Sequence, residues 1–422
     1  MILSSSGATS LRGLSRNEKE PDPMSPAPLN SNRRFQIILF LGIMNALTPF
    51  TIDLYLPAFA DIAKDLNTTV ARVSLSVATY FVGFALGQIL YGPLLDRFGR
   101  KPPIYLGLVL YIVASLGCLT AKSVEALWTF RFLSALGGSA SSVGAVTMVR
   151  DYFAPKDGAK VFSMLMLVLS VSPLFAPSIG GWIAAELGWR AIFGVLTCMA
   201  IANIALVAFG LPLAYHADRS VSLRPAKMAQ VFSEILKIRQ FRVNAISGAL
   251  AFSGLFLYVT GSPAIFIESF GVSKGTFGLI FAIVAGAMIG GGQLNNFLLK
   301  RVESEVIFRR AITTQMILSA VFLVLVALTD LGLVATVTFF FFVLGSVGVG
   351  YPNAAALALR PIERNIGSAS SLLGFLQMGL GALLASLVGL MEVKGTLPTV
   401  LVLAFSSALA GTLLFFGNRV RD

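Results

Sequence analysis

Gly-Pro-Leu-Leu-Asp-Arg-Phe-Gly-Arg-Lys, residues 92–101, is the stretch that decides the fold. Apolar runs at about 73–91 and 103–121 flank it, and each is long enough to cross a bilayer as a helix, which takes about 20 apolar residues. Four of the last six residues of the stretch are charged, and three of those are basic. Because basic short loops stay on the cytoplasmic side, the stretch is predicted to be a cytoplasmic turn between two membrane-spanning helices.

The composition places the whole chain in a membrane. Of the 422 residues, 56% are hydrophobic and 12% are charged, whereas a soluble domain is roughly one quarter charged. Cys118 and Cys198 fall inside apolar runs and are expected to be unpaired, and the only histidine, His216, lies in a polar loop. No P-loop pattern occurs. We therefore expect no metal, no cofactor and no enzymatic activity.

The net charge of +12 is distributed unevenly between the two sides of the membrane. If the amino terminus is cytoplasmic, the inward segments hold 25 of the 32 Lys and Arg residues and the outward loops hold six. The remaining one, Arg131, lies within a predicted helix. This asymmetry follows the positive-inside rule, so we do not expect nucleic acid as a partner.

Twelve membrane-spanning helices are predicted from the apolar runs. A run of about 20 apolar residues is interpreted as one span. The longest interruption, 214–241, divides the spans six and six. The predicted spans are 35–59, 72–95, 103–121, 126–150, 159–184, 190–213, 242–267, 275–299, 307–329, 333–359, 367–391 and 396–417.

We therefore expect an all-α integral membrane protein with two six-helix pseudo-repeats and with both termini in the cytoplasm. Leu56-Pro57-Ala58 is echoed by Ser262-Pro263-Ala264, 206 positions later. Such paired halves are typical of transporters, which bind their substrate near the midplane between the halves. The predicted segments are a disordered cytoplasmic tail (1–34), an N-terminal bundle (35–213), a basic cytoplasmic linker (214–241), a C-terminal bundle (242–417) and a short cytoplasmic tail (418–422).

Two charges lie well inside predicted spans, Asp53 in the first and Arg131 in the fourth. A charge at the bilayer centre costs roughly 2.5–3.5 kcal/mol on insertion scales, so such residues are usually functional and paired. Both lie about five or six residues from the outer ends of their spans and could share one cavity. The alternatives are a purely structural ion pair or an arginine that reaches the outer interface. The candidates for lining the cavity are Asn45, Tyr80, Tyr258, Asn353 and Gln377.

The turn at 92–101 has the pattern G-x-x-x-D-R-x-G-R-K, which resembles the loop between helices 2 and 3 of the major facilitator superfamily. In that superfamily the loop is a cytoplasmic latch between the two halves of a transporter. The resemblance implies the same role for the residues that match the motif, which are Gly92, Asp96, Arg97, Gly99, Arg100 and Lys101.

Three further stretches resemble one branch of that superfamily. Residues 51–57, Thr-Ile-Asp-Leu-Tyr-Leu-Pro, resemble the first-helix signature of the bicyclomycin/chloramphenicol-resistance (Bcr/CflA) drug exporters. Residues 131–138 resemble the fourth-helix motif R-x-x-Q-A-x-G, with Ser134 in place of the glutamine. The third stretch resembles the fifth-helix antiporter motif G-P-x-x-G-G, with an alanine first, and includes Ala176, Pro177, Gly180 and Gly181.

The resemblance implies a proton-coupled antiporter that exports small drugs or metabolites, with Asp53 and Arg131 in proton and substrate coupling. Two positions depart from the pattern. Asn45 stands where some multidrug relatives carry a second acid, and Asn295 and Asn296 stand where an acid might echo Asp96 in the second half. One membrane acid and a degenerate second latch are therefore expected.

Two other functions compete with export. A proton-coupled symporter importing a small nutrient has the same fold, but the antiporter-like motif at 176–181 argues against it. A non-transporting membrane sensor is disfavoured by the intact charge pair and by the lack of a sizeable soluble domain. The expected protein is a monomer in the cytoplasmic (inner) membrane, in contact with the lipid bilayer, a small-molecule substrate and protons.

Overall fold

The computed structural model describes residues 31–153, 172–211, 217, 225–362, 366–391 and 395–419. Every regular element in these ranges is helical, and 11 helices are long and apolar enough to cross a membrane. The predicted all-α membrane fold is thus confirmed. The fifth predicted span lies partly outside the described residues, and its described part is helical over 172–186. His216 and most of the predicted tail 1–34 also lie outside them.

The helices of the N-terminal half begin and end at recognisable signals. Thr69 caps the helix Val70–Phe98 by accepting a hydrogen bond from Arg72 N at 3.2 Å. Gly99 ends this helix with a φ of +81°, a left-handed conformation that favours glycine. The elements are α1 (Ser31–Asp53), η1 (Leu56–Ala58), α2 (Phe59–Asp65), α3 (Val70–Phe98), α4 (Lys101–Thr120), α5 (Val124–Tyr152), helix 172–186, α7 (Trp189–Ala205) and η2 (Leu206–Gly210).

The C-terminal half starts with an amphipathic helix, α8 (Pro225–Lys237), inside the predicted linker. Its apolar side chains Val231, Phe232 and Ile235 pack against residues of α9 and α13 such as Phe241 and Leu372. The elements that follow are α9 (Arg239–Ser262), η3 (Pro263–Ser269), α10 (Lys274–Leu298), α11 (Ser304–Leu328), α12 (Leu333–Leu359), α13 (Ile366–Leu390) and α14 (Leu397–Arg419).

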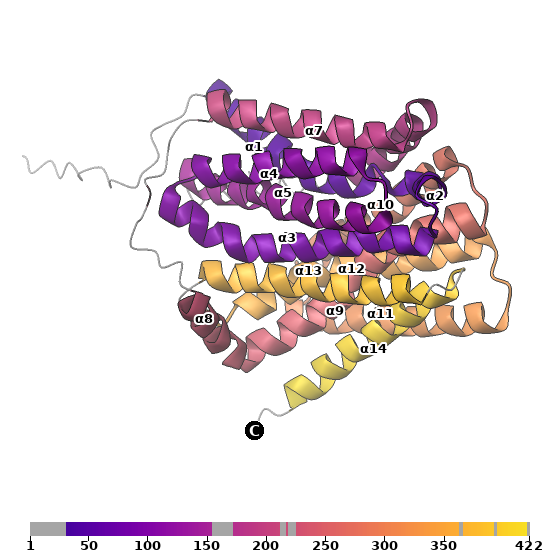
Figure 1. Ribbon diagram of the computed structural model, residues 1–422. Coiled ribbons are helices and arrows are strands. Elements are labelled where there is room, and N and C mark those ends of the chain that lie inside the picture. Colours follow the sequence, from indigo (N-terminus) through magenta and orange to yellow (C-terminus); the bar gives the residue numbers. More distant parts are fainter. Residues whose placement is uncertain are drawn as a thin grey trace, which may run out of the picture.

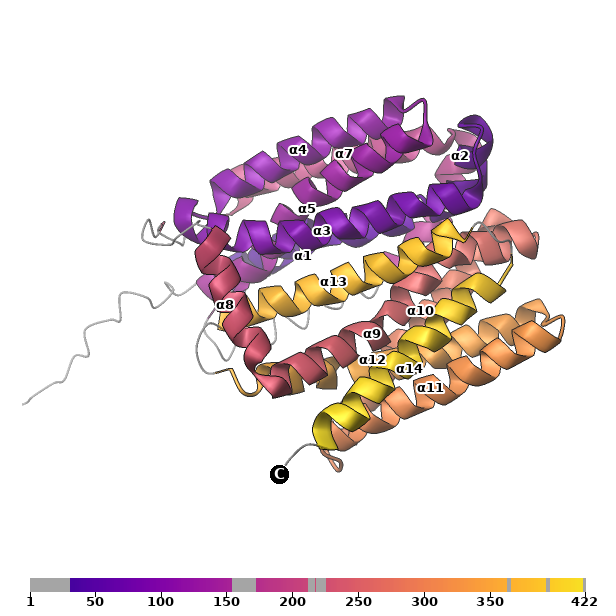
Figure 2. The ribbon, with the colours of Figure 1, turned by 60° about the horizontal axis from the view of Figure 1, so that its bottom comes forward.

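The helices of the two halves form two groups that meet along a seam (Figure 1). Helices α3 and α13 lie side by side along this seam in both ribbon views (Figure 2). Small residues allow the approach, because a Cβ added at Gly374 of α13 would lie 2.1 Å from Gln88 Oε1 of α3. The seam therefore brings helices from opposite halves of the chain close together.

The molecule has two distinct ends. One end, called here the latch end, carries residues 92–101 and α8 (Figure 2). The opposite end carries α2 and is called the α2 end. The first helix of each half is broken at a proline near the α2 end, at Pro57 in η1 and at Pro263 in η3, and these two short elements contact each other.

Candidate functional site

Arg131 on α5 is fully buried and is held by aromatic rings and one carbonyl oxygen. Its guanidinium carbon lies 4.4 Å from the ring centroids of both Tyr55 and Tyr80. Its Nη1 donates to the backbone oxygen of Thr51 at 3.0 Å. Its Nε and Nη2 have no hydrogen-bond partner among the described residues. The charge is thus stabilised mainly by two cation–π contacts.

The last turn of α1 is positioned by hydrogen bonds from neighbouring helices. The Thr51 hydroxyl lies 2.5 Å from Leu47 O and 2.7 Å from the Tyr111 hydroxyl of α4. Because Thr51 O also accepts from Arg131, α4 and α5 both hold this turn. The turn ends at Asp53, so its geometry sets the position of the predicted coupling acid.

Asp53 is 4% exposed, and no described residue forms a hydrogen bond or an ion pair with its carboxyl group. The structure does not pair it with Arg131, whose Nη1 reaches the backbone two residues earlier. Asp53 ends α1 just before η1, which contacts η3 and α10 of the other half, so Asp53 lies next to the seam.

The antiporter-like motif packs against the chain directly after Asp53. A Cβ added at Gly180 would lie 1.7 Å from Leu54 O, so helix 172–186 touches the break in the first span. A Cβ at Gly181 would lie 3.6 Å from Pro57 Cβ and 3.3 Å from Lys274 Cβ of α10. Ala176 is fully buried in the same helix. The motif therefore brings the end of α1 together with the other half.

Four of the five predicted cavity-lining residues carry a buried polar atom without a hydrogen-bond partner among the described residues. These atoms are Asn45 Nδ2, Tyr80 OH, Tyr258 OH and Gln377 Nε2. Unpartnered buried polar groups are uncommon, and each calls for an explanation such as a function or an unseen ligand. The four residues come from α1, α3, α9 and α13, which include helices of both halves.

Asn353, the fifth predicted lining residue, lies elsewhere and is fully hydrogen-bonded. Its Nδ2 donates to Asn295 Oδ1 at 2.6 Å and to Val349 O at 2.8 Å, and its Oδ1 accepts from Ser304 at 2.5 Å. This neutral network joins α10, α11 and α12 near the latch end. Asn295, the predicted counterpart of Asp96, therefore takes part in an amide network instead of an ion pair.

The latch residues form a charged network within the N-terminal half. Arg100 donates through Nε and Nη2 to both carboxylate oxygens of Asp151, at 2.7 and 3.1 Å, and through Nη1 to Asp96 at 2.8 Å. Burial disfavours the charged guanidinium, but these hydrogen bonds outweigh it and raise the pKa of Arg100. Lys101 donates to Ala208 O of η2 at 3.2 Å. The network thus fastens α3, α4, α5 and η2 together.

Other latch residues lie at the edge of that network. Arg97 lies 5.9 Å from the centroid of the Phe98 ring. Gly92 faces the other half, since a Cβ there would lie 3.8 Å from Ser371 Oγ of α13. Asp151 was not among the predicted site residues, although it ends the fourth span directly after Arg150.

An ion pair that the sequence did not predict joins the two halves at the α2 end. Asp61 on α2 pairs with Lys274 at the start of α10. Both side chains are partly exposed, at 40% and 28%. Each belongs to a predicted outward loop, but loop charges alone do not show which residues meet across a seam.

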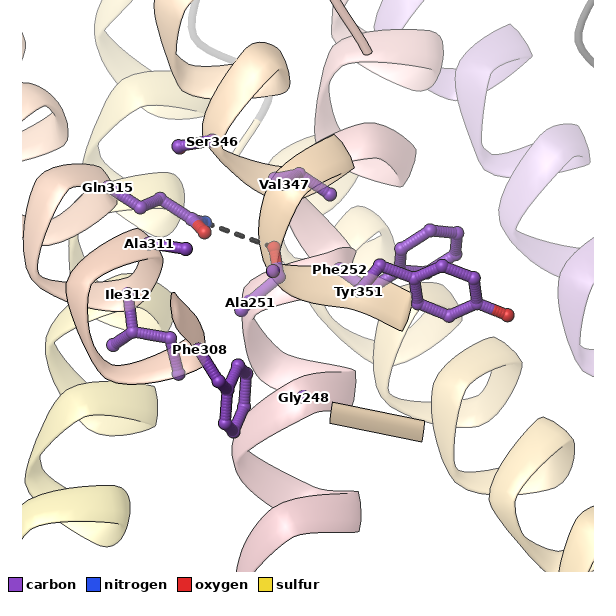
Figure 3. A pocket seen from close by; sticks show the side chains of 11 residues that line it. Gly248, Ala251, Phe252, Phe308, Ala311, Ile312, Gln315, Ser346, Val347 and Tyr351 are labelled. Carbon is purple, nitrogen blue, oxygen red and sulfur yellow. Dashed lines mark hydrogen bonds between the residues drawn. The ribbon is translucent and has the colours of Figure 1, made fainter. Parts of the chain in front are cut away.

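A smaller and a larger cavity formed by described residues lie in the C-terminal half, and Asp53 and Arg131 line neither of them. The first, of about 10 Å³, lies between α9, α11 and α12 (Figure 3). Gln315 beside it donates to Ala251 O at 3.0 Å, while the stacked rings of Phe252 and Tyr351 point away from it (Figure 3). This volume holds about one water molecule. The second cavity, of about 320 Å³, lies near the latch end beside Ser304.

Comparison with known proteins identifies the family. The family model of the Major Facilitator Superfamily matches residues 41–386. The chain belongs to this superfamily. It is therefore a transporter rather than an enzyme, in contact with the bilayer and a small substrate, and a multi-pass protein of the cytoplasmic membrane.

Relatives of this superfamily member carry drug-resistance names, in agreement with the predicted Bcr/CflA resemblance. The bicyclomycin resistance protein homolog of Haemophilus influenzae is 34% identical over 364 residues, covering 86% of this chain and 91% of the relative. The chloramphenicol resistance protein of Pseudomonas aeruginosa is 29% identical, covering 83% and 84%. The multidrug resistance protein MdtL of Escherichia coli is 30% identical, covering 85% and 89%.

Solved structures support the fold of this superfamily member. The D-xylose-proton symporter aligns with a TM-score of 0.70 at 15% identity, covering 91% of this chain and 97% of the other. The nucleoside transporter NupG aligns with a TM-score of 0.70 at 12% identity, covering 93% and 100%. At this identity the similarity concerns the fold alone.

Proposed function

We propose that this chain is a proton-coupled antiporter that exports small drugs or metabolites by alternating access, and that it works as a monomer. Its latch end then faces the cytoplasm, and the units that move are the predicted bundles 35–213 and 242–417 joined by the linker 214–241. The drug-resistance names of its relatives support export as the direction.

The observation that carries the proposal is the setting of Asp53. Among the described residues the buried charged side chains are Asp53, Arg100 and Arg131, so Asp53 is the one buried acid there. It lies two residues after Thr51, whose backbone oxygen accepts from Arg131, and just before η1, which contacts η3 of the other half. A buried ionised carboxylate without a partner is costly, so its protonation depends on which side the seam opens to. Asp53 and Arg131 are accordingly proposed as the coupling residues.

The test replaces Asp53 with asparagine and follows export in everted membrane vesicles. With chloramphenicol as the probe and an imposed pH gradient, Asp53→Asn should abolish accumulation because it removes the titrating group. The matched control is Asp330→Asn, which changes an exposed acid in the same way. Accumulation of chloramphenicol driven by the pH gradient in Asp53→Asn vesicles at the parental rate would refute the coupling role. Chloramphenicol movement by the parent in the same direction as the protons would indicate symport, and therefore import.

A further inference from the structure

Asp53 lies between two residues that are tied to other helices through their hydroxyl groups. Thr51, two positions before it, forms a hydrogen bond of 2.7 Å with the hydroxyl of Tyr111 on α4. Tyr55, two positions after it, forms a hydrogen bond with the hydroxyl of Ser76 on α3. All four of these side chains are buried. Since the carboxyl of Asp53 has no hydrogen-bond partner among the described residues, its position depends on the backbone that these two ties hold.

The direction of each tie follows from the single hydrogen that a hydroxyl carries. Thr51 donates to a carbonyl oxygen one turn earlier in its own helix at 2.5 Å, so Tyr111 is the donor to Thr51. Ser76 likewise donates to a carbonyl oxygen one turn earlier at 2.5 Å, so Tyr55 is the donor to Ser76. Each tie is therefore a chain from phenol to hydroxyl to carbonyl, and hydrogen bonds in such chains strengthen one another.

Arg131 contacts the segment 51–55 on both sides of Asp53. Its Nη1 donates to Thr51 O at 3.0 Å, and its guanidinium carbon lies 4.4 Å from the centroid of the Tyr55 ring. The Tyr55 hydroxyl is fixed at the far end of that ring, so the tie to Ser76 also sets the ring plane that the cation faces. The two ties thus hold the segment in one place relative to Arg131.

The fourth span lacks side chains where Tyr111 passes it. Helix α5 packs against both α1 and α4. A Cβ added at Gly137 would lie 2.7 Å from Tyr111 N, and a Cβ at Gly138 would lie 3.0 Å from Tyr111 Cδ2. Because these two positions are glycines, the Tyr111 ring can cross the backbone of α5 and reach Thr51 on α1.

We propose that Tyr111 and Tyr55 are positioning residues of the coupling site, and that their hydroxyl groups hold the segment 51–55 so that Asp53 keeps a fixed place relative to Arg131. Loss of one tie lets the backbone around Asp53 shift, which slows coupling. This inference rests on the proposed function, because it assigns two further residues to that same site.

The first experiment separates positioning from substrate contact. Tyr111→Phe and Tyr55→Phe each remove only a hydroxyl, and the matched control is Tyr105→Phe, six positions before Tyr111 on the same helix. Initial rates of chloramphenicol accumulation in everted vesicles are measured against its concentration. Each tie variant should lower the maximal rate about tenfold, the equivalent of one hydrogen bond. The KM of the tie variants and both constants of the control should stay within about twofold of the parent. A raised KM with an unchanged maximal rate would make the hydroxyls substrate contacts and overturn the proposal.

Two replacements of Thr51 separate positioning from packing. Thr51→Val keeps most of the volume and removes the hydroxyl, whereas Thr51→Ser keeps the hydroxyl and removes a methyl group. Positioning requires the serine variant to export faster than the valine variant, and the opposite order would overturn the proposal. Thr51→Val combined with Tyr111→Phe should export no more slowly than Thr51→Val alone, because both changes break the same tie. Effects that multiply would contradict a shared tie and overturn the assignment of Tyr111.

Hydrogen–deuterium exchange tests the ties without transport. In the purified full chain in lipid nanodiscs, peptides containing residues 47–55 should exchange about tenfold faster in Tyr111→Phe and Tyr55→Phe than in Tyr105→Phe. Unchanged exchange in either tie variant would overturn the assignment of that tyrosine. Failure of the proposed function has a different signature: the exchange is faster in the tie variants, while the parent shows no proton-driven accumulation. The two tyrosines then still hold the segment, and the export function is wrong.

Discussion

Arg131 is held inside the bundle by two tyrosine rings and one carbonyl oxygen, and no described acid pairs with it. A desolvated cation–π contact contributes about 2 kcal/mol, which offsets only part of the cost of burying a guanidinium. Replacing a buried charge with an apolar side chain of similar volume is often neutral or stabilising. We therefore expect Arg131→Met to unfold at a temperature no lower than the parent and yet to lose proton-driven export.

Two measurements decide the role of this residue. Thermal unfolding in detergent reports the stability of the Arg131→Met protein, and chloramphenicol accumulation in vesicles reports its activity. Export at the parental rate would show that the arginine only fills space. A much lower unfolding temperature would show that the contacts of Arg131 with Tyr55 and Tyr80 stabilise the fold.

At the scale of elements, helix 172–186 and the end of α1 touch at Gly180. A Cβ there would lie 1.7 Å from Leu54 O, so Gly180→Ala must displace the backbone next to Asp53. Because a misplacement of about 1 Å can cost about 100-fold in rate, we expect export to fall by that order. The control is Gly194→Ala on α7, where the added Cβ would lie 3.9 Å from its nearest neighbour, Leu119. Equal export by the two variants would contradict the expectation.

At the scale of the whole molecule, the Asp61–Lys274 ion pair holds the two halves together at the α2 end. We expect Asp61→Lys and Lys274→Asp each to open this end, because each places like charges opposite one another. An exposed pair contributes at most about 1 kcal/mol, so each change should shift the populations of the open and closed states about fivefold or less. Spin-label distances across the seam measure this shift.

The double exchange, Asp61→Lys with Lys274→Asp, is the control for that experiment. It restores the attraction with the charges reversed and should return the distance distribution to that of the parent. Distances that stay open in the double variant would mean that the contact depends on side-chain geometry, and unchanged distances in the single variants would mean that the pair does not hold the halves.

The sequence alone determined the class of protein, most helix boundaries and the two charged side chains well inside predicted spans, Asp53 and Arg131. Membrane spans must satisfy their backbone hydrogen bonds internally, so long apolar runs predict helices without knowledge of their neighbours. The predicted span 333–359 coincides with α12, for example. Asp53 and Arg131 stand out for the same reason, since charges inside such runs are costly. The turn at 92–101 is likewise local, because its residues are contiguous.

Only the tertiary structure decided which side chains meet. Arg131 contacts Tyr55 and Tyr80 instead of Asp53, Asn353 joins an amide network near the latch end, and Asp61 pairs with Lys274 from 213 positions away. These contacts depend on how each helix is rotated and which helix lies beside it. Helices that are apolar on nearly all sides carry little amphipathic periodicity to indicate their rotation, so the packing of the two halves, and with it the site, had to come from the fold.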